Sequence, residues 1–203
     1  IHTMKIICSK SSLLKSVSIA LKAVPSKTTM PILECILMDA TTNQIKFTTN
    51  DMELGIETIV EGTIEEKGKV ALDAKIFYEI IRRLPDNDVT IKTDDKYAAT
   101  ITCEKAKFNI PGKSGEDFAY LPMIEKDEPL TISQYTLKEM IRQTIFSIAV
   151  NENNKLMTGE LFEIKNNCLK VVSLDGHRIS IRKMLLKNCL LYTSPSPRDM
   201  RRS

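Results

Sequence analysis

Three amphipathic helical segments recur 60 to 63 residues apart, and this recurrence constrains the fold more than any other feature of the 203-residue chain. Lys15, Lys75 and Lys138 occupy comparable positions on them (75 − 15 = 60; 138 − 75 = 63). Each segment is preceded by one strand-like run and followed by three. A period of this length indicates duplicated β-α-β-β-β units and not a solenoid of short repeats.

Apolar residues at helical spacing predict the bounds of the three helices. The first covers residues 12–24, and the second covers 73–84, with Asp73 as its N-cap. The third begins at Thr136, which is expected to form a capping box with Glu139, and extends to 148. The side chains expected to face the interior are Leu13, Leu14, Val17, Ala20, Leu21 and Val24 on the first helix, Ile76, Phe77, Ile80, Ile81 and Leu84 on the second, and Leu137, Met140, Ile141, Ile145 and Ile148 on the third.

Short apolar or alternating runs between turn residues predict the strands. Asn166-Asn167 and Asp175-Gly176 are expected to be two-residue hairpin turns. The predicted strands are residues 4–9, 32–40, 44–49, 54–63, 69–72, 89–93, 97–103, 107–110, 130–133, 160–165, 168–174 and 177–182.

The repeat predicts an α+β fold in which helices pack on antiparallel sheets. Two β-α-β-β-β units form one domain, residues 4–122, and the charged segment 123–129 is a linker. A third unit, residues 129–184, is the first half of a second domain. Residues 185–203 contain two Ser-Pro steps and resemble translated vector sequence, so we expect a non-native tail; a proline-rich ligand or a phosphorylation site is the alternative.

The net charge of +3 belongs to this tail. Residues 4–124 carry 16 basic and 17 acidic side chains, and residues 125–184 carry 9 and 8, so the tail supplies the remaining +3 (−1 + 1 + 3). A nucleic-acid interaction must therefore depend on where charges lie and not on their sum.

The five cysteines lie far apart and form no C-x-x-C pair, and the chain has two histidines. We therefore expect no metal site, no cofactor and no disulfide framework, as in a protein of the reducing cytoplasm. No apolar run is long enough for a membrane span, so no membrane partner is expected.

Asp175, His177 and Arg178 allow two interpretations. An acid, an imidazole and a guanidinium could serve a small hydrolase, but no recognisable nucleophile accompanies them. An Asp-Gly turn between two strands explains the same residues, and a binding role for His177 and Arg178 stays open. The hydrolase is kept as the alternative function.

Basic side chains occupy the predicted solvent face of each helix, for example Lys75 with Arg82 and Lys138 with Arg142. One such face is ordinarily just solvated. The same placement on all three helices suggests a shared positive surface, which would contact phosphates without reading sequence.

Several motifs, in order and spacing, resemble the bacterial DNA polymerase III beta subunit family, the sliding clamps. The resemblance covers residues 4–184. The motifs that carry it are Met30-Pro31-Ile32-Leu33, Thr49-Asn50-Asp51-Met52-Glu53, Ile81-Arg82-Arg83-Leu84-Pro85, Gly115-Glu116-Asp117-Phe118 and Ser173-Leu174-Asp175-Gly176-His177-Arg178.

The resemblance implies a non-catalytic processivity factor with a DNA-clamp fold. Such a clamp closes as a homodimeric ring around double-stranded DNA and tethers the replicative polymerase, the clamp loader and other proteins that carry a clamp-binding motif. This chain is expected to be an N-terminal fragment of one, located in the cytoplasm.

The resemblance also implies three sets of site residues. Lys27, Lys75, Arg82, Lys138, Arg142 and Lys155 are the expected DNA contacts. Met157, Leu174, Gly176, His177, Arg178 and Ile179 are expected to form one half of a groove for partner peptides, and Lys105, Lys107, Phe108 and Ile110 are expected at the dimer interface.

Overall fold

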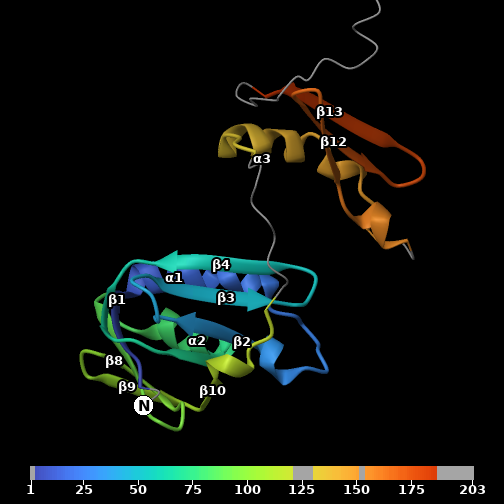
Figure 1. Cartoon of the computed structure of the whole chain (residues 1–203). Coiled ribbons are helices and arrows are strands. Elements are labelled where there is room, and N and C mark those ends of the chain that lie inside the picture. Colours follow the sequence, from blue (N-terminus) through green and yellow to red (C-terminus); the bar gives the residue numbers. More distant parts are fainter. Residues whose placement is uncertain (1–2, 121–129, 151–153, 187–203) are drawn as a thin grey trace, which may run out of the picture. The chain divides into compact units, whose positions relative to one another are not determined.

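The computed structural model describes residues 3–120, 130–150 and 154–186. The chain forms two compact units, Ile1–Ile124 and Glu125–Ser203, here called unit 1 and unit 2 (Figure 1). No helix in the described ranges is long and apolar enough to cross a membrane. The predicted tail lies outside these ranges from residue 187 onward.

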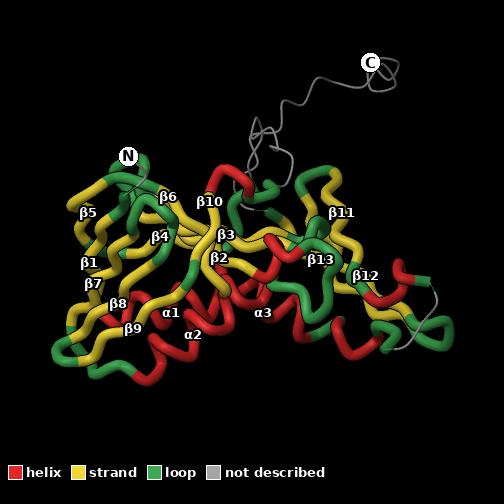
Figure 2. The backbone as a smooth tube through the Cα atoms, turned by 90° about the horizontal axis from the view of Figure 1, so that it is seen from below, coloured by secondary structure: helices red, strands yellow, loops and turns green. Residues whose placement is uncertain are grey.

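Unit 1 contains two helices packed on two five-stranded antiparallel sheets. Figure 2 shows α1 and α2 next to each other along one side of the unit. The elements are β1 (Lys5–Ser9), α1 (Lys10–Ala20), the 3₁₀ helices η1 (Leu21–Ala23) and η2 (Pro31–Glu34), β2 (Cys35–Asp39), β3 (Ile45–Asn50), β4 (Gly55–Val60), β5 (Thr63–Glu66), β6 (Lys69–Asp73), α2 (Ala74–Arg83), β7 (Asp88–Thr93), β8 (Ala99–Cys103), β9 (Ala106–Ile110), β10 (Gly112–Ser114) and η3 (Gly115–Asp117).

The two halves of unit 1 exchange strands. The sheet orders are β5-β1-β7-β8-β9 and β10-β6-β2-β3-β4. Strand β1, which leads into α1, pairs with β7, which follows α2; reciprocally, β6 leads into α2 and pairs with β2. This order confirms the predicted duplication and shows that each half completes the other half's sheet.

The predicted strand 54–63 is wrong as one element, because it divides into β4 and β5 in different sheets. The chain crosses between the sheets at Gly62, where an added Cβ would lie 2.5 Å from the Ile7 carbonyl oxygen. A glycine is therefore required at this crossing. Strand β10 was not predicted, and the start of the predicted strand 32–40 is instead η2.

The core of unit 1 lies between the helices and both sheets. Phe77 of α2 is fully buried and meets Phe47 of β3 edge to face, with ring centroids 6.1 Å apart. Ile76, which the pattern assigned to the interior, is instead 51% exposed. Its helix position faces away from the sheets, next to the solvent-facing Lys75.

Unit 2 is a smaller α+β unit with one helix and one three-stranded antiparallel sheet in the order β11-β12-β13. Its core contains Met140, Leu169, Val171 and Leu186. Its elements are α3 (Gln134–Arg142), η4 (Ile145–Ser147), η5 (Lys155–Thr158), β11 (Leu161–Lys165), β12 (Cys168–Leu174) and β13 (Ile179–Leu185).

Three predictions for unit 2 are wrong. The N-cap of α3 is Ser133, whose hydroxyl accepts a hydrogen bond from the Thr136 amide, and Glu139 binds Arg142 instead of closing a capping box. The helix ends at Arg142, so that Ile145 lies in η4 and is 46% exposed. The third error is the predicted strand 130–133, which is not a strand and pairs with none of the described strands.

Unit 2 repeats the first half of unit 1 with a constant shift of 124 residues. Helix η1 at 21–23 recurs as η4 at 145–147, and η2 at 31–34 recurs as η5 at 155–158 (145 − 21 = 155 − 31 = 124). The strand register agrees, since the pair Leu37–Thr48 recurs as Leu161–Val172. The described residues from 130 to 184 therefore correspond to residues 6–60 at this one shift.

A buried hydroxyl recurs at the same shift. Thr49 of β3 donates to the carbonyl of Ala20 at the end of α1, and Ser173 of β12 donates to the carbonyl of Thr144 just beyond α3, each at 2.5 Å. Both hydroxyls are almost fully buried. In each unit this bond ties an inner strand of the sheet to the chain at the end of the helix; the Thr144 carbonyl also accepts the Ser147 amide at 3.0 Å.

We expect Phe77→Ala to lower the free energy of unfolding by about 3–5 kcal/mol, because it leaves a cavity between α2 and β3. Ile76→Ala changes the adjacent residue of the same helix, yet we expect a loss below about 1 kcal/mol, because this side chain is half exposed. Urea titration followed by circular dichroism measures both. Equal losses would contradict this description of the helix.

Candidate nucleic-acid and partner interfaces

The basic residues of α2 lie on its exposed side. Lys75, Arg82 and Arg83 are exposed. Glu79 lies between them, with its Oε2 2.6 Å from Arg82 Nη2 and 3.4 Å from Arg83 Nη2. The hydrogen bond and the charge of Glu79 raise the pKa of Arg82.

The same arrangement recurs on α3. Arg142 donates to Glu139 through Nε (3.0 Å) and Nη2 (2.8 Å), and Lys138 is exposed beside them. This hydrogen bonding lowers the pKa of Glu139 and raises that of Arg142. On both helices a glutamate three residues earlier thus neutralises the arginine that was predicted to contact DNA.

The sequence reasoning did not pair these glutamates with the arginines, although the spacing of three residues before each arginine permits such a pair. Lys27 is exposed in the loop between η1 and η2 of unit 1. Lys155 is exposed at the first position of η5 in unit 2. The six predicted DNA contacts are therefore all at the surface, three in each unit.

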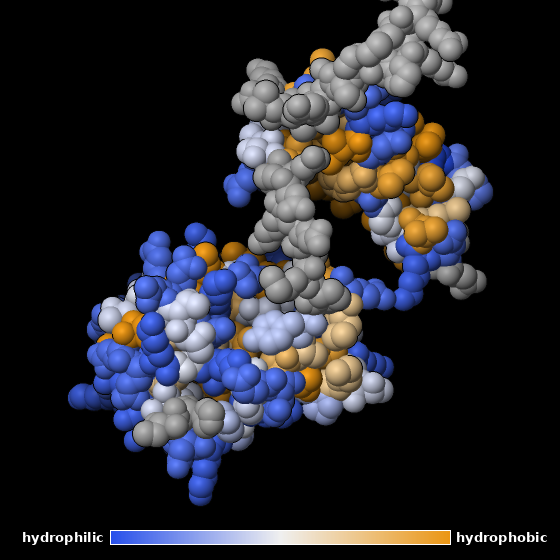
Figure 3. Space-filling model, viewed as in Figure 1, coloured by the Kyte–Doolittle hydropathy of each residue, from blue (hydrophilic) through white to orange (hydrophobic). Residues whose placement is uncertain are grey.

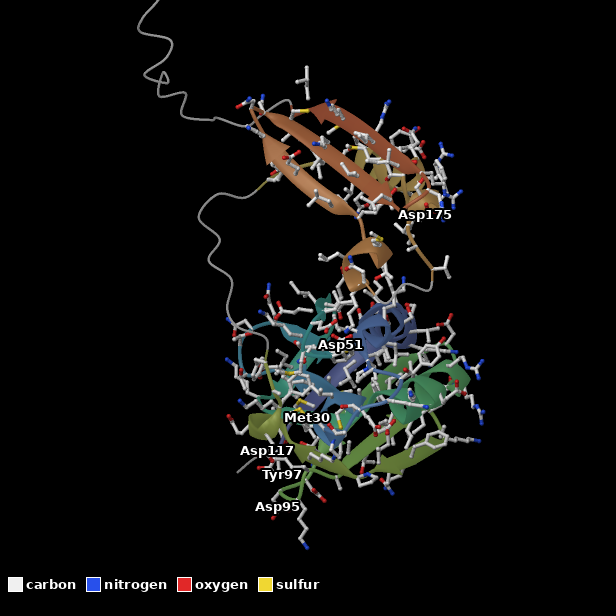
Figure 4. The ribbon with its side chains drawn as sticks, turned by 90° about the vertical axis from the view of Figure 1, so that its right-hand side faces the viewer. Met30, Asp51, Asp95, Tyr97, Asp117 and Asp175 are labelled. Carbon is white, nitrogen blue, oxygen red and sulfur yellow. The ribbon has the colours of Figure 1, made fainter. Side chains whose placement is uncertain are left out.

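Asp175 organises the loop that joins β12 to β13 (Figure 4). Its Oδ1 accepts the main-chain amides of His177 and Arg178, both at 3.1 Å, and its Oδ2 accepts Arg178 Nε at 2.8 Å. These bonds, that from the His177 amide first, lower the pKa of Asp175. The Arg178 guanidinium also lies 5.9 Å from the ring centre of Phe146 in η4.

The loop has four residues, so the predicted two-residue turn is wrong here. Leu174 pairs directly with Ile179, and Gly176 adopts a φ of 84° that favours glycine. The predicted turn at Asn166-Asn167 is confirmed, with φ values of 51° and 58° as a type I′ hairpin requires.

An equivalent loop occurs 124 residues earlier in unit 1. There Asp51 Oδ1 accepts the amides of Glu53 (2.9 Å) and Leu54 (2.7 Å) between β3 and β4. The aspartate is therefore part of the turn in both units. In unit 2 its carboxylate meets the main chain of His177 and the side chain of Arg178, and this is not the carboxylate–imidazole contact that a hydrolase would need.

The predicted groove residues come from three elements. Gly176, His177 and Arg178 are exposed in the β12–β13 loop, and Ile179 is 60% exposed at the start of β13. Leu174 is half-buried at the end of β12. Met157 is half-buried in η5, whose main chain is held by a hydrogen bond of 2.9 Å from the Ala149 amide to the Met157 carbonyl.

The residues predicted at a dimer interface lie in or beside β9, an edge strand of its sheet. Lys105, Lys107 and Phe108 are exposed, whereas the side chain of Ile110 is buried in the core. Phe108 is 39% exposed and lines a cavity of about 320 Å³ with the exposed Ile76 of α2. Ile76 is the part of this surface that the sequence reasoning missed, because it had been assigned to the interior.

Comparison with known proteins identifies both units. Residues 4–122 match the N-terminal domain of the DNA polymerase III beta subunit, and residues 131–191 match its central domain. The chain belongs to the DNA polymerase III beta subunit family. The predicted α+β clamp fold is thereby confirmed.

Individual relatives agree with this family. The beta sliding clamp of Bacillus subtilis (strain 168) is 35% identical over 90% of this chain and 50% of its own length. The structure of a DNA polymerase III beta subunit from Eubacterium rectale ATCC 33656 is 69% identical, with a TM-score of 0.86 over 91% of this chain and 51% of that chain. A sliding clamp from Bartonella birtlesii, solved bound to griselimycin, is 26% identical, with a TM-score of 0.84 over 91% and 50%. The chain thus spans about half the length of the beta subunits it matches.

We expect Asp175 to titrate below its ordinary pKa of 3.8, because amides and Arg178 stabilise the charged form. A pKa that folding lowers adds stability above the ordinary value, and this contribution is lost as the pH falls through the lowered pKa. The Arg178 side chain should therefore detach only in that acid range. NMR titration of the Asp175 carboxyl carbon and of Arg178 Nε measures this, and Asp175→Asn should remove the transition. A carboxyl midpoint at or above 3.8 would contradict the loop geometry.

Proposed function

We propose that this chain supplies part of a bacterial sliding clamp, a processivity factor that encircles duplex DNA as a homodimeric ring and holds the replicative polymerase on it. The observation that carries the proposal is that both units match, in order, two domains of the DNA polymerase III beta subunit. In this role the protein performs no chemistry, needs no cofactor and acts in the cytoplasm. Residues 4–122 and 129–184 correspond to the N-terminal domain and the first half of the central domain.

The exposed basic side chains support a sequence-independent contact with DNA phosphates. Lys75 and Lys138 have long flexible side chains on the solvent face of their helices. Arg82 and Arg142 are already paired with glutamates, so a phosphate must compete with a carboxylate for each guanidinium. Such contacts are weak and sensitive to salt, and a ring that slides along DNA requires weak contacts.

The β12–β13 loop supports the proposed partner groove. A short peptide gains most of its affinity from a few apolar anchors. Half-buried Leu174 and exposed Ile179 provide apolar surface, and Arg178 is pre-positioned beside them by Asp175 and Phe146. This half of the groove suits a peptide of the kind carried by polymerases and the clamp loader, with apolar side chains and an acidic or carbonyl group near Arg178.

The edge of β9 supports the proposed homodimer contact. An edge strand offers unpaired main-chain groups to a second strand. Phe108 and Ile76 add exposed apolar surface there, and Lys105 and Lys107 add positive charge at its margin. The side chain of Ile110 contributes to the core beneath this edge and not to the surface itself.

For the DNA contact, we expect the combined change of Lys75, Arg82, Lys138 and Arg142 to Ala to weaken binding to a short duplex at low salt. The slope of log K against log salt is negative, and each lost phosphate contact reduces its magnitude by about 0.9. The magnitude should therefore fall by roughly 3 to 4. Fluorescence anisotropy across a salt series measures it. The matched control changes four exposed lysines on strands and turns, Lys67, Lys92, Lys96 and Lys165, to Ala.

The control variant loses the same four positive charges as the helix variant. A general charge effect would therefore reduce the magnitude of the salt slope equally in both variants. That result, or an unchanged slope in the helix variant, would remove these four residues from the DNA contact.

For the peptide groove, we expect Ile179→Asp to weaken binding of a peptide with apolar anchors at least tenfold, which corresponds to about 1.4 kcal/mol. The residue is 60% exposed, so the substitution should leave unit 2 folded. Ile59→Asp is the control, since Ile59 is 58% exposed on β4 of unit 1. Isothermal titration calorimetry with a polymerase-tail peptide measures both, and equal affinities would place the groove elsewhere.

A further inference from the structure

Helices α2 and α3 carry the same three kinds of side chain along one line of the helix, here called the α2 row and the α3 row. The line runs through the second, fifth and ninth residues after the N-cap, a spacing that keeps them on one helix face. Counted from Asp73, the α2 row is Lys75, Tyr78 and Arg82. Counted from Ser133, the α3 row is Tyr135, Lys138 and Arg142. The lysine and the tyrosine exchange places, and the arginine keeps its position.

The fold alone does not require this composition. Helix α1 has Ser9 as its N-cap, and its same three positions hold Ser11, Leu14 and Ser18. Unit 1 therefore contains an equivalent helix with neither a charge nor an aromatic ring along this line. Hydrophilic residues, in blue, cover much of the face of unit 1 that Figure 3 shows, so a polar surface by itself singles out no site. The recurrence of one set of side chains on two helices does.

The hydroxyls of the two tyrosines are available to a ligand. Tyr135 is 77% exposed. The ring of Tyr78 is half-buried and packs against the core of unit 1, but its hydroxyl is not buried. Neither hydroxyl forms a hydrogen bond with any residue that the structure describes. Because a tyrosine hydroxyl is a hydrogen-bond donor as well as an acceptor, each can donate to an anionic oxygen.

Each tyrosine also lies near the arginine of its own row. On both helices the paired glutamate raises the pKa of the arginine most, and the tyrosine adds to this rise: Tyr78 for Arg82 and Tyr135 for Arg142. The tyrosine oxygens are thus close enough to act electrostatically on the guanidinium groups. A phosphate that approaches either arginine therefore comes near a tyrosine hydroxyl as well.

We propose that Tyr78 and Tyr135 are further contacts of the DNA backbone, each donating a hydrogen bond from its hydroxyl to a phosphate oxygen beside the arginine of its row. The inference rests on the proposed contact of α2 and α3 with duplex DNA. Phosphates commonly accept hydrogen bonds from tyrosine. The ends of a row are seven residues apart (82 − 75 = 142 − 135 = 7), about 10.5 Å along the helix. Phosphates of one strand are spaced by about 3.4 Å along the duplex axis, so one row can reach more than one phosphate.

A tyrosine gives this contact a property that lysine and arginine lack. The salt dependence of DNA binding arises from counterions that are released when cationic side chains neutralise phosphates. A neutral hydroxyl releases none, so its contribution should be equal at low and high salt. Paired bases are stacked inside a duplex, and a tyrosine ring can stack on bases only in a single strand. On a duplex the hydroxyl is therefore the group that makes the contact.

The first test removes both hydroxyls and keeps both rings, by combining Tyr78→Phe with Tyr135→Phe. We expect the affinity for a short duplex, measured by fluorescence anisotropy, to fall about three- to tenfold at every salt concentration. The slope of log K against log salt should not change, because no charge is lost. Tyr120→Phe is the control, since Tyr120 is 52% exposed and lies outside the helices, and this variant should bind as the parent does.

Four results would overturn the inference. They are an affinity equal to the parent's, an equal loss in the control, a slope of reduced magnitude, which would show an effect through the charged residues, and a loss confined to single-stranded DNA, which would assign the rings to bases. If the parent does not bind the duplex, or if the four-alanine helix variant keeps its slope, the proposed DNA contact itself fails and the inference fails with it.

The second test exchanges two side chains within the α3 row. Tyr135→Lys combined with Lys138→Tyr gives α3 the order found on α2. Both positions are exposed, so unit 2 should remain folded. The row keeps its charge and its hydroxyl, and we expect the affinity and the salt slope to equal those of the parent. An exchanged variant that binds no more tightly than Tyr135→Phe would overturn the inference.

Discussion

The exchange of strands between two β-α-β-β-β halves is the interaction on which unit 1 depends. Because β1 pairs with β7 and β6 pairs with β2, neither half can complete a sheet alone. The helices then pack against strands of both halves and share one core, with Phe47 and Phe77 meeting inside it. The stability of each helix is therefore tied to the pairing of strands far away in the sequence.

The sequence was sufficient to predict the period, the three helices and most strands, since each repeats a local pattern of apolar residues. It was not sufficient where tertiary contacts decide the outcome. Ile76 fits a helical apolar stripe, yet the sheets cover the neighbouring Phe77 instead. Residues 130–133 read as a strand, but a strand needs a partner, and none of the described strands supplies one. The site residues were predicted from the family resemblance, whereas the pairing of Glu79 with Arg82 and of Glu139 with Arg142 was not predicted, although the three-residue spacing allows it.

The shift of 124 residues separates what the scaffold needs from what distinguishes unit 2. Asp51 and Asp175 hold equivalent loops by the same amide hydrogen bonds, so this aspartate serves the turn. The side chains that follow it differ: Met52-Glu53-Leu54 in unit 1 and Gly176-His177-Arg178 in unit 2. If the β12–β13 loop binds a partner as proposed, its recognition surface would have arisen through side-chain changes alone, while the backbone stays as the fold requires.

If the basic faces of α2 and α3 contact DNA as proposed, the Glu–Arg pairs on them would keep that contact weak. Each pair is exposed, so its net contribution to stability is small. Each arginine is nevertheless pre-positioned, and the nearby glutamate repels a phosphate that approaches too closely. When a phosphate approaches, the arginine would exchange its hydrogen bond to the glutamate for one to the phosphate. The net change in free energy would therefore be small. Lys75 and Lys138, which form no ion pair within 4.0 Å among the described residues, would then supply most of the attraction, which acts through solvent and falls as salt screens it. A surface built in this way would attract the DNA backbone as a whole and favour no single phosphate, which is the physical condition for the proposed sliding.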